Sequence, residues 1–206
     1  MKILEIKTLV FPEIKVMKFA RFLDNRGYFT ELYKRSDFQK IDFLKDIEFL
    51  QNNGSFSKAG VIRGLHFQWN PYMNKLVKTI SGQMIDLFLD IRVGSPNFGK
   101  IGAYNMNNQP ESDYDQWIWI PVGFAHGNIF VKDTTIEYYC TAEYSPTTEA
   151  SISPLSSDID WSMIDKNLKD IYDQVCKKPN ISEKDKNGFT LDEWLKDERS
   201  VFFTYS

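Results

Sequence analysis

Apolar and polar residues alternate along much of the chain between residues 16 and 144. The clearest run is residues 85–92 (IDLFLDIR), where every odd position is a branched apolar residue and three of the four even positions are charged. A period of two is that of a β-strand with one core face and one polar face. Similar runs lie at residues 75–80, 117–120, 128–131 and 136–141, with turn-forming residues such as Gly82 between them. Many short strands separated by turns predict an all-β sandwich, jelly roll or barrel.

The pattern changes near Trp161, beyond which apolar residues recur at steps of three and four, as on one face of a helix. These residues are Ile164, Leu168, Ile171 and Val175. Residues 190–193 (TLDE) have the form of a capping box and predict a second short helix. The polar residues 177–188 between the two helices are expected to form a linker. We therefore expect residues 1–161 to form the all-β domain and residues 162–206 a short helical C-terminal extension packed on it.

Composition excludes several classes of protein. Lys and Arg number 25 against 28 Asp and Glu, and this net charge of −3 lacks the basic excess that binds a phosphate backbone, so no nucleic-acid partner is expected. The N-terminus lacks the apolar stretch of a signal peptide, and no stretch is long and apolar enough to span a membrane. The two cysteines, Cys140 and Cys176, are too few for a disulfide framework. The expected location is the cytoplasm, with both thiols free.

Few residues could carry chemistry. The two histidines, His66 and His126, lie sixty positions apart with no Cys-x-x-Cys or His-x-His nearby, so a metal site has little support. Dinucleotide-binding, phosphate-loop and serine-hydrolase motifs are absent as well. Arg63 and His66 should point to opposite faces of a strand, but Gly64 could host a bulge that brings both into one cavity. Such a pair suits an anionic ligand and a proton acceptor, although a structural histidine beside a surface arginine fits this segment equally well.

Several motifs in order resemble one family, the nucleotide-sugar 3,5-epimerases of the 4-dehydrorhamnose type, which are cupin-like jelly rolls. They are residues 24–31 (DNRGYFTE), 51–57 (QNNGSFS), 60–68 (GVIRGLHFQ), 75–77 (KLV), 90–92 (DIR), 95–99 (SPNFG) and 120–127 (IPVGFAHG). The resemblance covers most of the chain, from about Phe19 to Trp161, and it favours a functional role for Arg63 and His66.

The resemblance implies an isomerase whose substrate is a nucleoside-diphosphate 4-keto-6-deoxy sugar. Hydrogens on C3 and C5 lie beside the C4 ketone, so removing either as a proton gives an enolate, and reprotonation from the opposite face inverts the centre. This chemistry needs a base, an acid and a positive group near the ketone oxygen. It needs no redox cofactor or metal. A homodimer is also implied, and closing exposed strand edges is a physical reason for one.

The family pattern implies His66 as the base and Lys75 near the developing oxyanion. The acid would be a tyrosine on the strand after His126. Counting back from residues 144–146 selects Tyr138, which we prefer, whereas counting forward from His126 selects Tyr139. The expected substrate contacts are Arg26, Phe29, Glu31, Gln51, Asn53, Arg63, His126 and Tyr139. Arg26 and Arg63 suit the diphosphate, because a planar guanidinium can bind phosphate through two hydrogen bonds.

Three questions stay open at this point. The family pairs its base with a carboxylate, whose expected position here falls nearest Ser156, with Asp158 two residues on. The alternatives to an epimerase are a 3,4-ketoisomerase on the same fold, against which Phe67 and Gln68 after His66 argue, and a non-catalytic sugar-nucleotide-binding module. The residues do not distinguish the nucleotide base, a hexose from a heptose, or inversion at C3 alone from inversion at C3 and C5.

Overall fold

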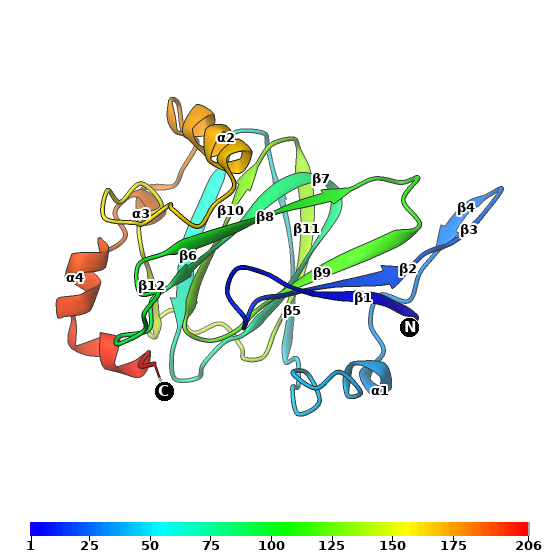
Figure 1. Cartoon of the computed structure of the whole chain (residues 1–206), viewed down its shortest axis with the longest axis horizontal. Helices are drawn as coiled ribbons and strands as arrows, with labels where there is room; N and C mark the ends of the chain where they lie inside the picture. The colour runs from blue at the N-terminus through cyan, green and yellow to red at the C-terminus, as the bar shows by residue number, and fades with distance from the viewer. Residues whose placement is uncertain (206) are drawn as a thin grey trace.

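The structure is a computed structural model that describes residues 1–205 and is built mainly from antiparallel strands (Figure 1). The strands are β1 (Ile3–Thr8), β2 (Lys15–Ala20), β3 (Phe22–Asp24), β4 (Gly27–Phe29), β5 (Gln51–Ser57), β6 (Ile62–Gln68), β7 (Lys75–Asp90), β8 (Ile101–Asn108), β9 (Tyr114–Ile120), β10 (Phe124–Phe130), β11 (Thr134–Cys140) and β12 (Glu149–Ser151). The helices are α1 (Arg35–Phe38), α2 (Lys166–Cys176), α3 (Glu183–Lys186), α4 (Leu191–Lys196) and the 3-10 helix η1 (Glu198–Phe202). The all-β jelly roll with a short helical C-terminal extension is confirmed.

The long strand β7 joins the two sheets of the sandwich. Its first half pairs with β9 and β11, and its second half pairs with β8 and β10. The strand passes from one sheet to the other near Gly82, whose φ is +93° and whose missing Cβ would lie 2.3 Å from the carbonyl oxygen of Asp133. Residues 75–80 and 85–92 were expected as two strands separated at Gly82, but residues 75–90 form one continuous strand, because glycine permits the bend without ending the pairing. Ile91 and Arg92 lie beyond its end.

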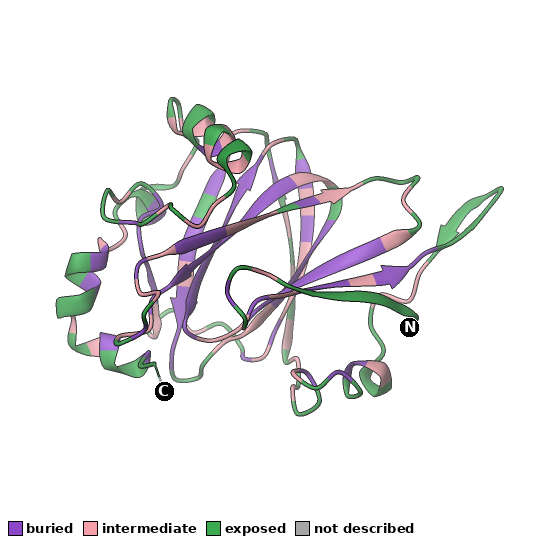
Figure 2. Ribbon diagram, viewed as in Figure 1, coloured by how far each residue is buried: buried purple, intermediate pink, exposed green. Residues whose placement is uncertain are grey.

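Both faces of the second half of β7 are buried, which the alternating pattern does not predict. Phe88 points into the space between the sheets, with Met84, Phe130 and Val77. The odd positions, among them Leu87 and Leu89, point outward into a second cluster. Residues 84–90 are all buried, and the central strands are mostly purple in Figure 2. The even, largely charged face is thus an interior face rather than a solvent-exposed one.

The C-terminal helices cover the outer face of the sheet that contains β6 and β10 (Figure 1). Tyr172 of α2, Leu191 and Trp194 of α4, and Phe203 pack there against the outward residues of β6 and β7. The expected stripe of α2 and the capping box of Thr190 and Glu193 are both confirmed. The division of the chain at Trp161 stays a prediction.

The prediction of a linker at residues 177–188 is wrong. This segment contains α3 and attaches to the sheets at both ends. Asn180 bridges to Val61, and Phe189, just beyond α3, bridges to Ile152. Asp185 of α3 is buried. The segment is largely polar in composition because its backbone and the Asp185 carboxylate make much of its contact with the strands, while Ile181 is an apolar side chain of the segment that packs against the core.

At the opposite end of the molecule, the hairpin β3–β4 projects away from the body and is green throughout in Figure 2. It forms a two-stranded sheet of its own. In the described part of the chain, no helix is long and apolar enough to cross a membrane.

Candidate functional site

A cavity opens between the two sheets and has two adjoining parts, of about 380 Å³ and 140 Å³. His66, Lys75 and Tyr138 line both parts. The larger part is also lined by Gln51, Asn53, Phe67, Gln68, Met73, Cys140, Tyr144 and Glu149. The smaller part adds Ser55, Arg63, His126, Gly127, Asn128 and Ile136. Of the eight expected substrate contacts, four lie here: Gln51, Asn53, Arg63 and His126.

An irregularity in β6 brings Arg63 and His66 to the same cavity. Gly64 between them has a φ of +109°, and the register of β6 against β10 shifts at this point. A Cβ on Gly64 would lie 2.6 Å from the Cα of Gly127, so two glycines allow the strands to approach closely. The expected bulge at Gly64 is therefore the physical reason that an arginine and a histidine three positions apart share one face.

His66 is hydrogen-bonded to a carboxylate from the C-terminal extension. Its Nε2 lies 2.7 Å from Oδ1 of Asp185, and Oδ2 of Asp185 accepts from the Gly64 N–H at 3.2 Å. Burial by itself raises the pKa of the Asp185 carboxyl, but the hydrogen bonds from His66 and Gly64 outweigh it and hold that pKa below its usual value. An ionised Asp185 accepts a hydrogen bond from the Nε2–H, which leaves Nδ1 of His66 as the proton acceptor.

Asp185 was missed by the sequence reasoning, which looked for the carboxylate near Ser156 and Asp158. Asp158 instead accepts from the Ser156 hydroxyl and from the backbone N–H of Asp192 at the start of α4, so it stabilises that helix. One signal was available, because Ser182-x-x-Asp185 has the form of a helix N-cap in a stretch otherwise taken as a linker. Ser182 does cap α3, accepting from the Asp185 N–H at 3.1 Å.

Lys75, at the first position of β7, brings a positive charge to both parts of the cavity. Its Nζ lies 3.5 Å from the carbonyl oxygen of His66, and both side chains line the same space. Loss of water around the ammonium lowers the pKa of Lys75, partly offset by Cys140, Glu149 and Asp86. A cation held without full hydration interacts more strongly with a developing negative charge than one at the surface does.

Strand alternation separates the two adjacent tyrosines of β11. Tyr138 faces the cavity, and burial raises the pKa of its phenol, which keeps the proton on the oxygen near neutral pH. Tyr139 faces the other side, where its ring packs 5.3 Å from that of Trp117 and 5.5 Å from that of Tyr33. Tyr139, expected among the substrate contacts, therefore lies in an aromatic cluster on the outer face of the sheet.

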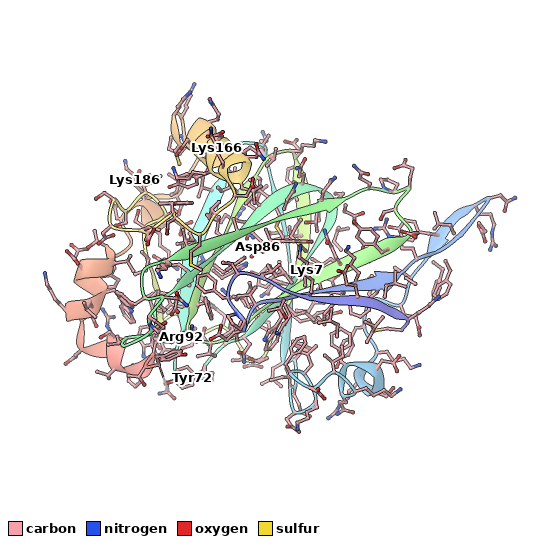
Figure 3. All side chains as sticks on the ribbon, in the orientation of Figure 1. Lys7, Tyr72, Asp86, Arg92, Lys166 and Lys186 are labelled. Atoms are coloured by element: carbon pink, nitrogen blue, oxygen red, sulfur yellow. The ribbon has the colours of Figure 1, made fainter. Side chains whose placement is uncertain are left out.

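A second histidine and carboxylate meet deep in the smaller part of the cavity. Nε2 of His126 lies 3.0 Å from Oδ2 of Asp86, and the Asn128 amide donates to the same oxygen at 3.1 Å. Asp86 is fully buried, and Figure 3 labels it near the middle of the molecule. The pair holds the His126 ring in place on β10.

Polar side chains fix one another at the wider end of the cavity. Gln51 donates to Asn53 at 2.9 Å and accepts from the backbone N–H of Tyr144 at 2.8 Å. The Tyr144 hydroxyl donates to Glu149 at 3.0 Å, and Glu149 forms an ion pair with Lys184 of α3. Arg63 is held by the Ser57 hydroxyl at 2.9 Å. These groups offer hydrogen-bond donors and acceptors to a polar ligand.

Three expected substrate contacts lie on or beside the projecting hairpin instead. The Arg26 side chain is 84% exposed and pairs with Asp24, and Phe29 is 66% exposed. Glu31 pairs with the amino group of Met1 at 2.8 Å. Within one chain, then, the structure does not bring these three residues to the cavity.

The cavity combines a carboxylate-backed imidazole, a protonated phenol and a buried ammonium. Such a set can remove a proton from a carbon beside a carbonyl, stabilise the resulting oxyanion and return a proton. Among residues 1–205, no three His, Cys, Asp or Glu side chains gather as metal ligands would.

Comparison with known proteins agrees with the geometry. The family described as dTDP-4-dehydrorhamnose 3,5-epimerase matches residues 8–193. The Shigella flexneri protein of that name is 35% identical over 187 residues, which cover 89% of this chain and 93% of the relative. The Neisseria gonorrhoeae protein of that name is 32% identical, and the match covers 87% of this chain but only 59% of that relative's length.

Solved structures give the same picture. A dTDP-6-deoxy-D-glucose-3,5-epimerase from Legionella pneumophila, in complex with dTDP-4-keto-L-rhamnose, superposes with a TM-score of 0.79 at 29% identity, covering 98% of both chains. A dTDP-4-dehydrorhamnose 3,5-epimerase from Sulfolobus tokodaii superposes with a TM-score of 0.72 at 34% identity, covering 94% of this chain and 97% of the other.

Proposed function

The chain belongs to the dTDP-4-dehydrorhamnose 3,5-epimerase family, and from this membership we propose that it inverts C3, C5 or both in a nucleoside-diphosphate 4-keto-6-deoxy sugar. It is an epimerase, and the reaction as proposed uses no cofactor. The sugar is a hexose or a heptose, and dTDP is the nucleotide to test first, because the relatives' names carry it.

The observation that carries the proposal is the 2.7 Å contact of His66 with Asp185 in a cavity that Tyr138 and Lys75 also line. Nδ1 of His66 takes the proton from the carbon beside the ketone, and Asp185 stabilises the imidazolium that forms. Lys75 stabilises the enolate oxygen. Tyr138 gives its phenolic proton to the opposite face of the carbon, which inverts the centre.

The remaining cavity residues bind the substrate. Arg63 can grip a phosphate through two hydrogen bonds, and it is held in place by Ser57. His126 is fixed by Asp86, while Gln51 and Asn53 face the wider end of the cavity. Because these side chains are already held by one another, they lose little freedom on binding the ligand.

Isotope exchange tests the function directly. The protein is incubated in D2O with 4-keto-6-deoxy hexoses and heptoses on dTDP and GDP, and C3 and C5 are followed by proton NMR and mass spectrometry. Deuterium at both carbons, with inverted product, supports 3,5-epimerisation, and deuterium at one carbon supports a narrower epimerase. A product with its ketone at C3 would identify a ketoisomerase. Ligand-dependent protection against melting without any exchange would identify a binding module.

Replacing Lys75 with methionine is expected to raise stability while lowering activity. Removing a poorly hydrated cation should raise Tm at pH 7 by about 2–4 °C, the effect of roughly 1 kcal/mol in a chain of this length. The folded-state pKa of Lys75 lies below its ordinary value of 10.5, so this gain shrinks as rising pH neutralises the wild-type ammonium. Calorimetry at pH 7 and pH 10 measures it, and kcat should fall ~10²-fold. An equal or lower Tm at pH 7 would contradict the prediction.

We also propose a homodimer in which the β3–β4 hairpin of one protomer enters the cavity of its partner. Arg26, Phe29 and Glu31 were expected to contact the sugar nucleotide, yet they lie outside the cavity of their own chain. In the proposed dimer, the hairpin of the second copy brings these residues to the cavity. The hairpin also exposes apolar Phe22 and Leu23, which a partner would cover.

Mixing two inactive variants tests the shared site. Arg26→Ala and His66→Ala homodimers should each be strongly impaired, whereas their heterodimer contains one site with both native residues. Random reassortment should therefore restore about a quarter of the wild-type rate. If the mixture stays as inactive as its components although heterodimers form, each site is built from one chain.

The cytoplasm is the proposed location, which suits an enzyme with the free thiols Cys140 and Cys176. The product is proposed to supply a surface polysaccharide.

A further inference from the structure

The turn that carries Asp185 is attached to the sheets on both sides. On its N-terminal side, Asn180 donates its N–H to the carbonyl of Gly60 at 3.3 Å and accepts from the Ile62 N–H at 3.0 Å. On its C-terminal side, Phe189 donates to the carbonyl of Ser151 at 2.8 Å and accepts from the Ser153 N–H at 2.9 Å. Only residues 181–188 lie between these attachments, so the position of Asp185 depends on both.

The C-terminal attachment is to β12, the strand that pairs with β6 beside His66. Ser151 of β12 is the residue opposite His66 in the pairing of β12 with β6. The same Ser151 accepts from Phe189, three residues beyond α3. The strand of His66 and the turn of Asp185 are thus both hydrogen-bonded to β12. A change in how the turn packs on β12 therefore alters the His66–Asp185 distance directly.

Gly188 makes this close approach possible. An ideal Cβ at this position would lie 2.8 Å from the Ser151 hydroxyl oxygen, 2.8 Å from the Ser153 nitrogen and 2.9 Å from the Ser151 carbonyl oxygen. Two of these three atoms are backbone atoms, one in β12 at Ser151 and one just beyond it at Ser153, and they cannot rotate away. The Ser153 hydroxyl, which is buried, adds a hydrogen bond to the carbonyl of Lys186 at 3.0 Å.

We propose that Gly188 is a positioning residue of the epimerase: by lacking a side chain it seats the α3 turn on β12 and so holds Asp185 against Nε2 of His66. The inference rests on the proposed function, in which His66 is the base. Alanine at this position forces the turn outward, and the imidazole then loses the partner that fixes its orientation and tautomer. A misplacement of about 1 Å at a reacting group can reduce the rate by ~10²-fold.

The test compares Gly188→Ala with Gly54→Ala. The control places its Cβ 3.9 Å from the nearest atom, the carbonyl oxygen of Ile136, and is expected to leave kcat unchanged. Gly188→Ala should lower kcat by roughly 10-fold or more while KM changes less than about threefold, because the chemical step is impaired rather than binding. Wild-type kcat in a folded Gly188→Ala protein would overturn the proposal.

Histidine NMR separates a positioning role from a general loss of structure. The chain has only two histidines, so ¹⁵N-histidine labelling gives signals from His66 and His126 alone. Gly188→Ala should change the imidazole signals of His66 and leave those of His126, which is bound to Asp86, as in the wild type. Equal changes at both rings, or at neither, would overturn the proposal. The NMR measurement needs no substrate. It therefore tests the position of Asp185 even if the proposed function is wrong and the wild type exchanges deuterium with no sugar.

If Gly188→Ala does not fold, Ser153→Ala tests whether the seating of the α3 turn positions Asp185 against His66. It removes the hydrogen bond to the Lys186 carbonyl and a longer one, of 3.3 Å, that the hydroxyl accepts from the Leu155 N–H, and it introduces no clash. A change confined to the His66 signals, with kcat lowered several-fold, supports the proposal. Unchanged signals together with wild-type kcat refute it.

Discussion

Replacing His66 with alanine is expected to abolish deuterium exchange at the sugar carbons. Without the imidazole, nothing else in the proposed mechanism removes the proton, and general bases of this kind contribute ~10²–10⁴-fold to a rate. We expect a fall of at least about 10³-fold in the exchange rate, measured by NMR in D2O. Nucleotide binding should persist, since other side chains carry it. Wild-type exchange in this variant would exclude His66 as the base.

A pair of carboxylate variants serves as the matched control for this prediction. Asp185→Asn should reduce exchange by ~10²-fold or more, because an amide cannot hold the same imidazole tautomer or stabilise the imidazolium. Asp158→Asn removes the same charge from the carboxylate nearest the position that the family resemblance indicated. Asp158 accepts from the Asp192 N–H in the first turn of α4 and does not touch His66, so the exchange rate of Asp158→Asn should match that of the wild type. Wild-type exchange in Asp185→Asn together with reduced exchange in Asp158→Asn would assign the orienting role to Asp158.

Replacing Tyr138 with phenylalanine is expected to remove inversion at one centre at least, while proton removal continues. The ring keeps its packing and loses only the phenolic oxygen, so the fold should persist. Inverted product should fall by ~10²–10⁴-fold, the range for a positioned acid. Deuterium can still return to the face from which the proton left, so exchange without inversion is the specific signature. Loss of exchange and inversion in equal measure would argue that Tyr138 has another role.

Tyr139→Phe is the matched control, because it removes the same atom from the neighbouring residue. Tyr139 packs against Trp117 on the outer face of the sheet, so its phenolic oxygen lies away from the cavity. Its inverted product should equal that of the wild type. If Tyr139→Phe loses inversion and Tyr138→Phe does not, the tyrosine assignment is reversed.

The local pattern of apolar and polar residues was sufficient to predict whether most segments form strands or helices. Alternation predicted the strands, and the three- and four-residue steps with the capping box predicted α2 and α4. These signals lie within a few residues of one another, so each segment carries its own information. The motifs that resemble the epimerase family singled out His66, Lys75 and Arg63, which line the cavity.

Register was harder to predict than element type. Counting from two fixed points selected two different tyrosines, and a shift of one residue moves a side chain to the other face of a sheet. The pairing of Tyr138 with Asn53 of β5 and Val77 of β7 decides which ring faces the cavity. Similarly, the charged positions of β7 lie inside the sandwich because the C-terminal helices cover its other face.

The sequence by itself therefore determined the all-β class, the helical tail and several of the residues that line the cavity, among them His66, Lys75 and Arg63. Only the tertiary structure decided that Asp185 is the partner of His66, across 119 positions of sequence, and that Arg26 and Phe29 lie away from the cavity of their own chain. The physical reason is that such contacts depend on how separate elements pack. A one-turn helix held by backbone pairing to β12, and by a glycine that permits it, leaves almost no periodic trace in the sequence.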